Sequence, residues 1–267
     1  MIDPAESEFP AARLSCESDP ELARLLATHA GVILLRLRGT LRGVPADRIR
    51  AEGDRRAHEF LTAALRRLRP GDAVLSDAVL SGGALGDPGR LDSDRVWIID
   101  PLDGTREYGE PGRSDWAVHV ALWEGGRLAA GAVALPGLGP TLSSEHPPAP
   151  RSVHRGPLRM LVSRSRPPEY ASAVAGPLGA ELLSMGSSGA KAMAVARGEA
   201  DLYLADGGGF EWASAAPVAV SLAAGLHASR LDGTALRYNN PDPVLPDLLI
   251  CRKDLAGQVL AAISAAR

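Results

Sequence analysis

The chain has 267 residues, of which 45% are hydrophobic and 23% charged, and its formal net charge is −3. This length suffices for one large domain or two closely packed ones, and the composition is ordinary for a soluble globular protein. A weakly acidic chain gives no support to binding of a nucleic-acid polymer or an anionic membrane, because both usually require a basic surface.

The cysteine content fits a reducing compartment, and the N-terminus and the apolar segments bear on targeting to membranes or export. Cys16 and Cys251 are the two cysteines, and they form no CxxC pair, so no zinc site is expected. Met1–Glu6 is acidic and lacks the basic and then apolar layout of a signal peptide. The most apolar stretch, Ala213–Leu226, is too short to span a bilayer. We therefore expect a cytoplasmic protein without a membrane partner.

The first part of the chain predicts two helices followed by a mostly antiparallel sheet. Ser18–Glu21 is typical of a helix start, and leucines follow at helical spacing. A second helix is expected over 54–69, where Pro70 and Gly71 end it. Strands are expected at 73–76 and 96–99, and a hairpin at 116–123 and 128–135.

A stretch rich in Pro, Gly and Ser, 136–157, separates two halves with different patterns. We expect an N-terminal α+β subdomain over 1–140 and a C-terminal α/β subdomain over 150–267 that closes a substrate cleft. In the second half strand and helix alternate, which is typical of α/β folds. Strands are expected at 158–162, 181–184, 201–204, 227–231 and 248–251, and helices at 169–175, 190–196, 212–224 and 255–265.

Asp100 and Asp103 follow a predicted buried strand directly. Two carboxylates so close repel each other unless they are protonated, separated or bridged by a cation. Gly104 allows close approach of the backbone to a ligand, and Thr105 adds a hydroxyl at a predicted helix start, where N–H groups favour a phosphate. Hard oxygen ligands beside such a turn indicate Mg²⁺. A surface turn is the competing interpretation, because Asp-Pro and Asp-Gly pairs are typical of turns.

Four segments in the same order resemble the inositol monophosphatase superfamily. Val96–Thr105 resembles its first signature, and Glu211–Pro217 its second, in which a Trp-Asp pair opens a helix. Gly186–Lys191 is similar to a stretch of the bisphosphate nucleotidase branch, and Gly53–Arg55 to an upstream acidic motif. The resemblance implies an α/β fold, a layered αβαβα sandwich. It also implies an actinobacterial-type 3′(2′),5′-bisphosphate nucleotidase that removes the 3′-phosphate of 3′-phosphoadenosine 5′-phosphate, or acts on a related phosphorylated nucleotide or small molecule.

The resemblance further implies roles for individual residues. One Mg²⁺ would be held by Asp77, Asp100 and the carbonyl of Leu102, and a second would be shared by Asp100 and Asp103. The other implied roles are orientation or deprotonation of the attacking water by Asp54 and Thr105, phosphate binding by the amides of Gly104 and Thr105, and substrate contacts from Ser187, Ser188, Lys191 and Glu211. For Lys191 a solvated surface lysine is the alternative. The family often forms dimers, so a homodimer is compatible with the resemblance.

Two positions depart from the family pattern. Ser76-Asp77-Ala78 replaces the usual Glu-Glu, so one acid is shorter by a methylene and the other is missing. Ala213 stands where the family has the Trp-Asp aspartate, a ligand of the second ion, and alanine has no oxygen to donate. Glu211 would need a different approach to compensate, and a role at a helix start favoured by the dipole is the simpler interpretation. The apolar, glycine-rich 79–87 segment is a candidate rebuilt loop.

Three functions stay open from the sequence. The chain is a working phosphatase, a diverged paralogue with a specialised biosynthetic role, or a non-catalytic binder of nucleotide or phosphate. Other hydrolase classes find no support, because the GxSxG elbow and the P-loop pattern are missing from the sequence.

Overall fold

The computed structural model describes residues 17–41, 43–77, 88–149 and 156–267. The expectations for Met1–Glu6, Cys16, Ala78 and the 79–87 loop therefore lie outside the described residues. Within the described ranges, no helix is long and apolar enough to cross a membrane.

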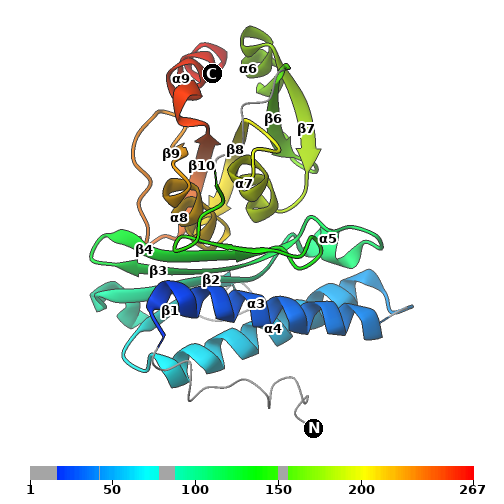
Figure 1. Ribbon diagram of the computed structural model, residues 1–267, viewed down its shortest axis with the longest axis vertical. Coiled ribbons are helices and arrows are strands. Elements are labelled where there is room, and N and C mark those ends of the chain that lie inside the picture. The colour runs from blue at the N-terminus through cyan, green and yellow to red at the C-terminus, as the bar shows by residue number, and fades with distance from the viewer. Residues whose placement is uncertain (1–16, 42, 78–87, 150–155) are drawn as a thin grey trace.

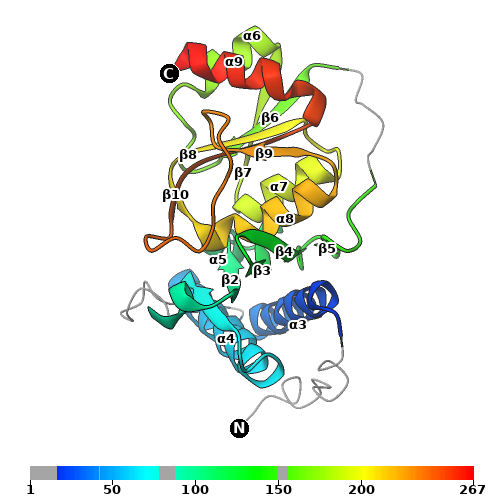
Figure 2. The same ribbon diagram turned by 90° about the vertical axis from the view of Figure 1, so that its left-hand side faces the viewer.

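The elements form five layers (Figure 1). Helices α3 (Asp19–Thr40) and α4 (Ala46–Leu68) cover one face of a first sheet, and α7 (Ser188–Ala196) and α8 (Ala215–Ala223) lie between this sheet and a second one. Helices α6 (Ala171–Leu178) and α9 (Ala256–Ala266) cover the outer face of the second sheet, at the opposite end of the molecule from α3 and α4 (Figure 2). The predicted αβαβα sandwich is confirmed.

The first sheet has the strand order β1-β2-β3-β4-β5. Its strands are β1 (Ala73–Ser76), β2 (Arg95–Asp103), β3 (Ala117–Glu124), β4 (Arg127–Ala134) and β5 (Thr141–Ser143). Only β1 and β2 pair in parallel, so the predicted mostly antiparallel sheet is confirmed. Because β5 pairs with β4, this sheet continues beyond the expected boundary at residue 140.

The second sheet has the order β7-β6-β8-β10-β9 and is mixed, with β6 parallel to both β7 and β8. Its strands are β6 (Leu158–Ser163), β7 (Ala180–Met185), β8 (Leu202–Phe210), β9 (His227–Ser229) and β10 (Val244–Cys251). Short 3₁₀ turns lie at η2 (Pro88–Asp92), η3 (Glu211–Ala213) and η4 (Lys253–Leu255), so the helix predicted over 212–224 is divided into η3 and α8.

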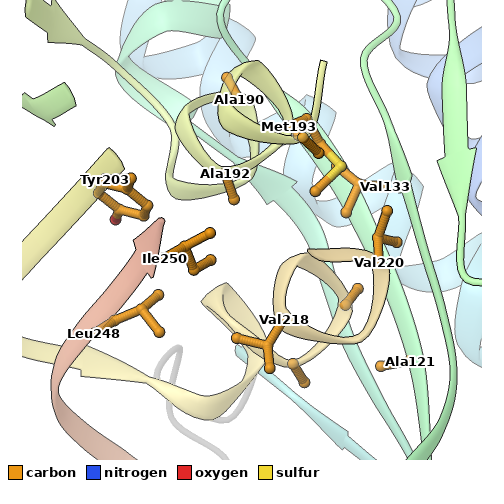
Figure 3. Packing of buried hydrophobic residues seen from close by; sticks show 14 of the residues in the cluster. Ala121, Val133, Ala190, Ala192, Met193, Tyr203, Val218, Val220, Leu248 and Ile250 are labelled. Atoms are coloured by element: carbon orange, nitrogen blue, oxygen red, sulfur yellow. The ribbon is translucent and has the colours of Figure 1, made fainter. Parts of the chain in front are cut away.

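The middle helices join the two halves into one core. Figure 3 shows Val133 of the first sheet, Met193 of α7, Val220 of α8 and Ile250 of the second sheet packed in the same cluster. The small residues of this layer allow close approach, and a Cβ at Gly131 of β4 would lie 2.5 Å from the Cβ of Ala219 in α8. Burial of apolar surface between both sheets therefore fixes the halves against each other.

Helix α3 begins as predicted, whereas α4 does not. The Ser18 hydroxyl accepts a hydrogen bond from the Glu21 amide at 3.4 Å, so Ser18 is the N-cap of α3. Helix α4 starts at Ala46, eight residues before the predicted start at Asp54. Gly53 and Asp54 therefore lie inside the helix, with Gly53 buried.

Candidate active site

A bulge in β2 sets the direction of the two motif acids. Asp100 lies opposite His119 of β3, but Asp103 lies opposite Ala117, so β2 carries one extra residue between them. In a regular strand, residues three apart point to opposite faces. The bulge places Asp100 and Asp103 on the same face, which is the face toward α7 and α8, since Ala117 packs in that cluster.

Asp100 lies among like charges and out of the solvent. Its side chain is buried, and burial raises the pKa of its carboxyl well above the ordinary value, with the charges of Asp77, Asp103 and Asp54 adding to the shift. A single hydrogen bond from the Leu102 amide to Oδ1, 3.2 Å long, acts in the opposite direction. Such crowding of carboxylates favours a bound cation.

Asp54 lies close to the motif because α4 packs very closely on the short helix that follows the motif turn. A Cβ at Gly53 would lie 2.5 Å from the Tyr108 ring of α5 (Thr105–Gly109), so only glycine allows this contact. The Oδ1 atom of Asp54 is buried and has no hydrogen-bond partner within the described part of the chain. Burial raises the pKa of the Asp54 carboxyl. A buried oxygen without a partner is costly unless a ligand or water satisfies it.

The turn after Asp103 requires glycine and opens a helix. Gly104 has a φ of 81°, and a Cβ there would lie 2.9 Å from the Cβ of Ser187 and 3.2 Å from the carbonyl oxygen of Asp115. Thr105 is the first residue of α5. The first N–H groups of a helix have no partners within it, so this turn presents donors to an anion.

Asp103 is bound to the loop that begins α7. Its Oδ2 accepts hydrogen bonds from the hydroxyl of Ser187 (2.6 Å) and from the amide of Gly189 (2.7 Å), and the Ser188 hydroxyl, 3.1 Å away, shares its proton between this oxygen and the carbonyl oxygen of Ala213 (2.7 Å). The Nε2 of His119 lies 3.4 Å from the same oxygen. The loop of the second half is thus held by a carboxylate of the first half.

Lys191 lies beneath this loop. Its ammonium donates to the carbonyl oxygens of Gly186 (2.7 Å), Ser187 (2.9 Å) and Met185 (3.5 Å), and the side chain is buried. Burial lowers the pKa of Lys191 to about 8. The alternative of a solvated surface lysine is therefore wrong. Lys191 borders the cavity described below, but the donors of its ammonium are directed to the backbone.

The expected substrate contact from Glu211 is wrong. Glu211 is fully buried and accepts hydrogen bonds from the amides of Asn239 (2.6 Å) and Asn240 (2.9 Å). Arg90, also buried, binds the same turn through Asn239 Oδ1 at 2.6 Å and the carbonyl oxygen of Asn240 at 2.7 Å. Glu211 therefore fixes this turn and cannot replace the acid lost at Ala213. No signal in the sequence indicated the role of Arg90.

A cavity of about 770 Å³ lies between the motif turn and the second sheet. Its lining brings together the predicted residues Asp103, Gly104, Thr105, Ser187, Ser188 and Lys191, together with Ala213. Sequence reasoning missed Arg166, Tyr170, Asp206 and Phe210, which also border it. Asp54, Asp77, Asp100 and Leu102 are not among the described lining residues, so the buried Asp100 and the half-buried Asp54 and Asp77 lie outside the cavity wall.

The donor set fits one divalent cation better than two. Asp54, Asp77 and Asp100 supply hard oxygens whose mutual repulsion a cation would relieve. At the second position Ala213 replaces one expected ligand, and one oxygen of Asp103 already accepts hydrogen bonds from Ser187 and Gly189. Within the described ranges, the one group of three acidic or histidine side chains whose ligand atoms all lie within 4.8 Å of one another is Glu21, Glu145 and His146, where Arg24 already pairs with Glu21. The ligand atoms of Asp54, Asp77 and Asp100 are farther apart than this, so these side chains would have to draw together around an ion.

Comparison with known proteins identifies the family. A profile described as the inositol monophosphatase family matches residues 23–147. A 3′-phosphoadenosine 5′-phosphate phosphatase of Mycobacterium tuberculosis is 48% identical over 246 residues, which are 88% of this chain and 89% of the relative. The chain belongs to the inositol monophosphatase family. Phosphatases of this family are generally metal-dependent.

Other relatives agree with this placement. The Mycobacterium leprae protein of the same name is 46% identical over 92% of this chain and 93% of its own, and the Escherichia coli 3′(2′),5′-bisphosphate nucleotidase CysQ is 30% identical over 68% and 76%. The Anabaena inositol monophosphatase structure matches the fold with a TM-score of 0.72 and 19% identity, covering 92% of this chain and 95% of its own. CysQ from Bacteroides thetaiotaomicron gives 0.68 and 24%, covering 92% and 99%.

Proposed function

We propose that this inositol monophosphatase family member is a Mg²⁺-dependent phosphomonoesterase that removes the 3′-phosphate of 3′-phosphoadenosine 5′-phosphate or a related phosphorylated nucleotide. The observation that carries the proposal is the crowding of the buried Asp100 carboxyl by Asp54 and Asp77, next to the Gly104–Thr105 turn at a 770 Å³ cavity. The names of the mycobacterial relatives support the choice of substrate.

The first cation position is assigned to the carboxylates of Asp77 and Asp100 and the carbonyl of Leu102. All of these ligands are hard oxygens, which suit Mg²⁺. When bound, the ion supplies an acidified water and offsets negative charge on the phosphate oxygens. Asp77 keeps this role despite its shorter side chain because it lies in the turn directly after β1, whose neighbour in the sheet is β2.

The remaining steps belong to the chain's own groups. The buried Oδ1 of Asp54 accepts a proton from the attacking water, since its raised pKa increases its basicity. The Thr105 hydroxyl orients that water, and the amides of Gly104 and Thr105 hold the phosphate oxygens. Ser187 and Ser188 line the cavity wall where the nucleoside lies, and Phe210 offers an aromatic face.

The test is phosphate release from 3′-phosphoadenosine 5′-phosphate with Mg²⁺ and with chelator. We expect metal-dependent release, and no release from adenosine 5′-phosphate, because its only phosphate is not at the 3′ position. Asp100→Asn should lower kcat/KM by about 10²-fold or more, because a charge-stabilising group is lost. The exposed Asp92→Asn is the matched control and should match the wild type. Absence of release from this substrate and from a broad panel of sugar and nucleotide phosphates would reject the proposal.

One observation favours a second candidate, a binder of nucleotide or phosphate that does not turn over. Ala213 and the hydrogen-bonded Asp103 leave the family's second cation position without its usual ligands. Calorimetry with 3′-phosphoadenosine 5′-phosphate distinguishes the two. Tight binding with an intact substrate supports the binder, and metal-dependent turnover excludes it.

A further inference from the structure

Asp103 holds the loop 187–189 through one of its two oxygens. The hydroxyl of Ser187 and the amide of Gly189 donate to Oδ2 at 2.6 and 2.7 Å. The Ser188 hydroxyl lies 3.1 Å from the same oxygen and shares its single proton with the carbonyl oxygen of Ala213 at 2.7 Å. A carboxylate has about four acceptor sites on its two oxygens, so the bonds from Ser187 and Gly189 already fill Oδ2. Hydrogen bonds to an ionised acceptor are stronger than neutral ones. The arrangement is therefore a strong tether between β2 and α7.

The tethered loop holds a backbone conformation that needs support. Ser187 has a φ of 27°, one of two positive values at non-glycine residues in the described part of the chain. Such a residue stores strain of order 1–3 kcal/mol, which its surroundings must offset. The Ser187 hydroxyl also accepts from the Ala190 amide at 3.0 Å, so it both caps α7 and donates to Asp103.

The space beside Asp103 is arranged for hydrogen bonds and not for a cation. The Ser188 hydroxyl lies 2.7 Å from the carbonyl oxygen of Ala213, whose methyl side chain offers no ligand. The ammonium of Lys191 is buried nearby and interacts with the charge of Asp103. Glu211 is committed to the 239–240 turn, so it supplies no substitute carboxylate.

We infer that Asp103 is a positioning residue that docks the 187–189 loop against the cavity, and that this chain binds one divalent cation instead of a pair. The inference rests on the proposed function only for the identity of the first ion. It makes Asp100 and Asp103 functionally different, although they belong to one motif: Asp100 binds the ion, and Asp103 shapes the cavity wall.

The experiment counts bound Mn²⁺ by electron paramagnetic resonance on the full chain, without substrate. The wild type should bind one ion. Asp103→Asn keeps an acceptor oxygen and should bind one ion with unchanged affinity, whereas Asp100→Asn should bind it at least about tenfold more weakly. Ala213→Asp should add a second ion. The matched control is Ala223→Asp, at the exposed last residue of α8, and this variant should bind one ion.

A kinetic readout separates docking from ion binding. Asp103→Ala removes the acceptor and should raise KM about tenfold, with a smaller change in kcat. Asp103→Asn keeps an acceptor, so its KM should lie close to that of the wild type. Two ions of similar affinity in the wild type would overturn the inference. Loss of ion affinity in Asp103→Asn equal to that in Asp100→Asn would overturn it too, and so would a single ion in Ala213→Asp.

Failure of this inference and failure of the proposed function give different results. One bound ion without phosphate release leaves the inference standing and rejects only the phosphatase. Phosphate release with two bound ions rejects the inference and leaves the phosphatase. No bound ion at all rejects the single-ion site together with the metal dependence of the proposed reaction.

Discussion

Lys191 carries a structural task that depends on its charge. The chain has only two lysines, Lys191 and Lys253, and their surroundings are opposite: Lys191 is 4% exposed, and Lys253 lies exposed in η4. The Lys191 ammonium supports the carbonyl groups of the loop on one side, and its distance of 5.1 Å to the centre of the Tyr203 ring adds a cation–π contact on the other.

Replacing Lys191 by Met should destabilise the protein by about 2–3 kcal/mol, because hydrogen bonds to a charged donor are lost and carbonyl groups become unsatisfied. Urea denaturation followed by circular dichroism measures the change. Lys253→Met is the matched control and should stay within about 0.5 kcal/mol of the wild type. Equal stability of the two variants would show that the loop does not depend on the ammonium.

The sequence predicted the motif residues better than their neighbours. Asp100, Gly104 and Thr105 could be located because strand, turn and helix start follow one another within a few residues. The buried acceptor role of Glu211 could not be predicted, since its partners at 239–240 are distant in the chain. The role of Arg90 could not be predicted either, because nothing in its local sequence pattern distinguishes a buried arginine from an exposed one.

At the scale of elements, a single glycine sets the contact between α4 and α5. The helix was expected to start at Asp54, after Gly53, and glycine in a helix interior is less favourable than alanine by about 1 kcal/mol. The packing against Tyr108 overrides this local preference, and α4 runs through it from Ala46. Most of the other elements had periodic apolar patterns, and for that reason their places were predicted within a few residues.

Gly53→Ala should therefore destabilise the protein by about 1–3 kcal/mol, because the new methyl would lie 2.5 Å from the Tyr108 ring. The matched control is Gly39→Ala in α3, where no atom lies within 4 Å of the added Cβ. The control should be neutral or more stable by up to about 1 kcal/mol. Thermal unfolding of both variants measures the difference, and a Gly53→Ala protein as stable as Gly39→Ala would contradict the contact.

At the scale of the whole molecule, the acid cluster couples stability to pH and to metal. The pKa of Asp100 is raised in the folded chain, so between the ordinary value of 3.8 and the raised value the folded state holds a proton that the unfolded state has released. The stability of the metal-free protein therefore falls as pH rises through this window. The proposed divalent ion would bind the carboxylate form, so its stabilising effect would grow over the same window.

We accordingly expect the gain in melting temperature on adding Mg²⁺ to be larger at pH 8 than at pH 5. Differential scanning calorimetry with Mg²⁺ or with chelator measures it. In Asp100→Asn, where the titrating group is missing, the metal-free protein should lose less stability between the two pH values than the wild type does. A gain from Mg²⁺ that is independent of pH would contradict the link between the buried acids and the ion.

The extra residue in β2 limits how the motif can change its length. Asp100 and Asp103 are three residues apart and share a face only because two residues of β2, Pro101 and Leu102, stand against one residue of β3, Val118. Deletion of one residue between them would restore regular pairing. The two acids would then stand two residues apart on the same face of an ordinary strand, but every residue after the deletion would shift by one position. Leu102 would lose its place in the turn, and Gly104 would no longer meet Ser187. Insertions and deletions are therefore tolerable in the hairpin at 125–126, but the number of residues from Asp100 to Gly104 behaves as a fixed length of the fold.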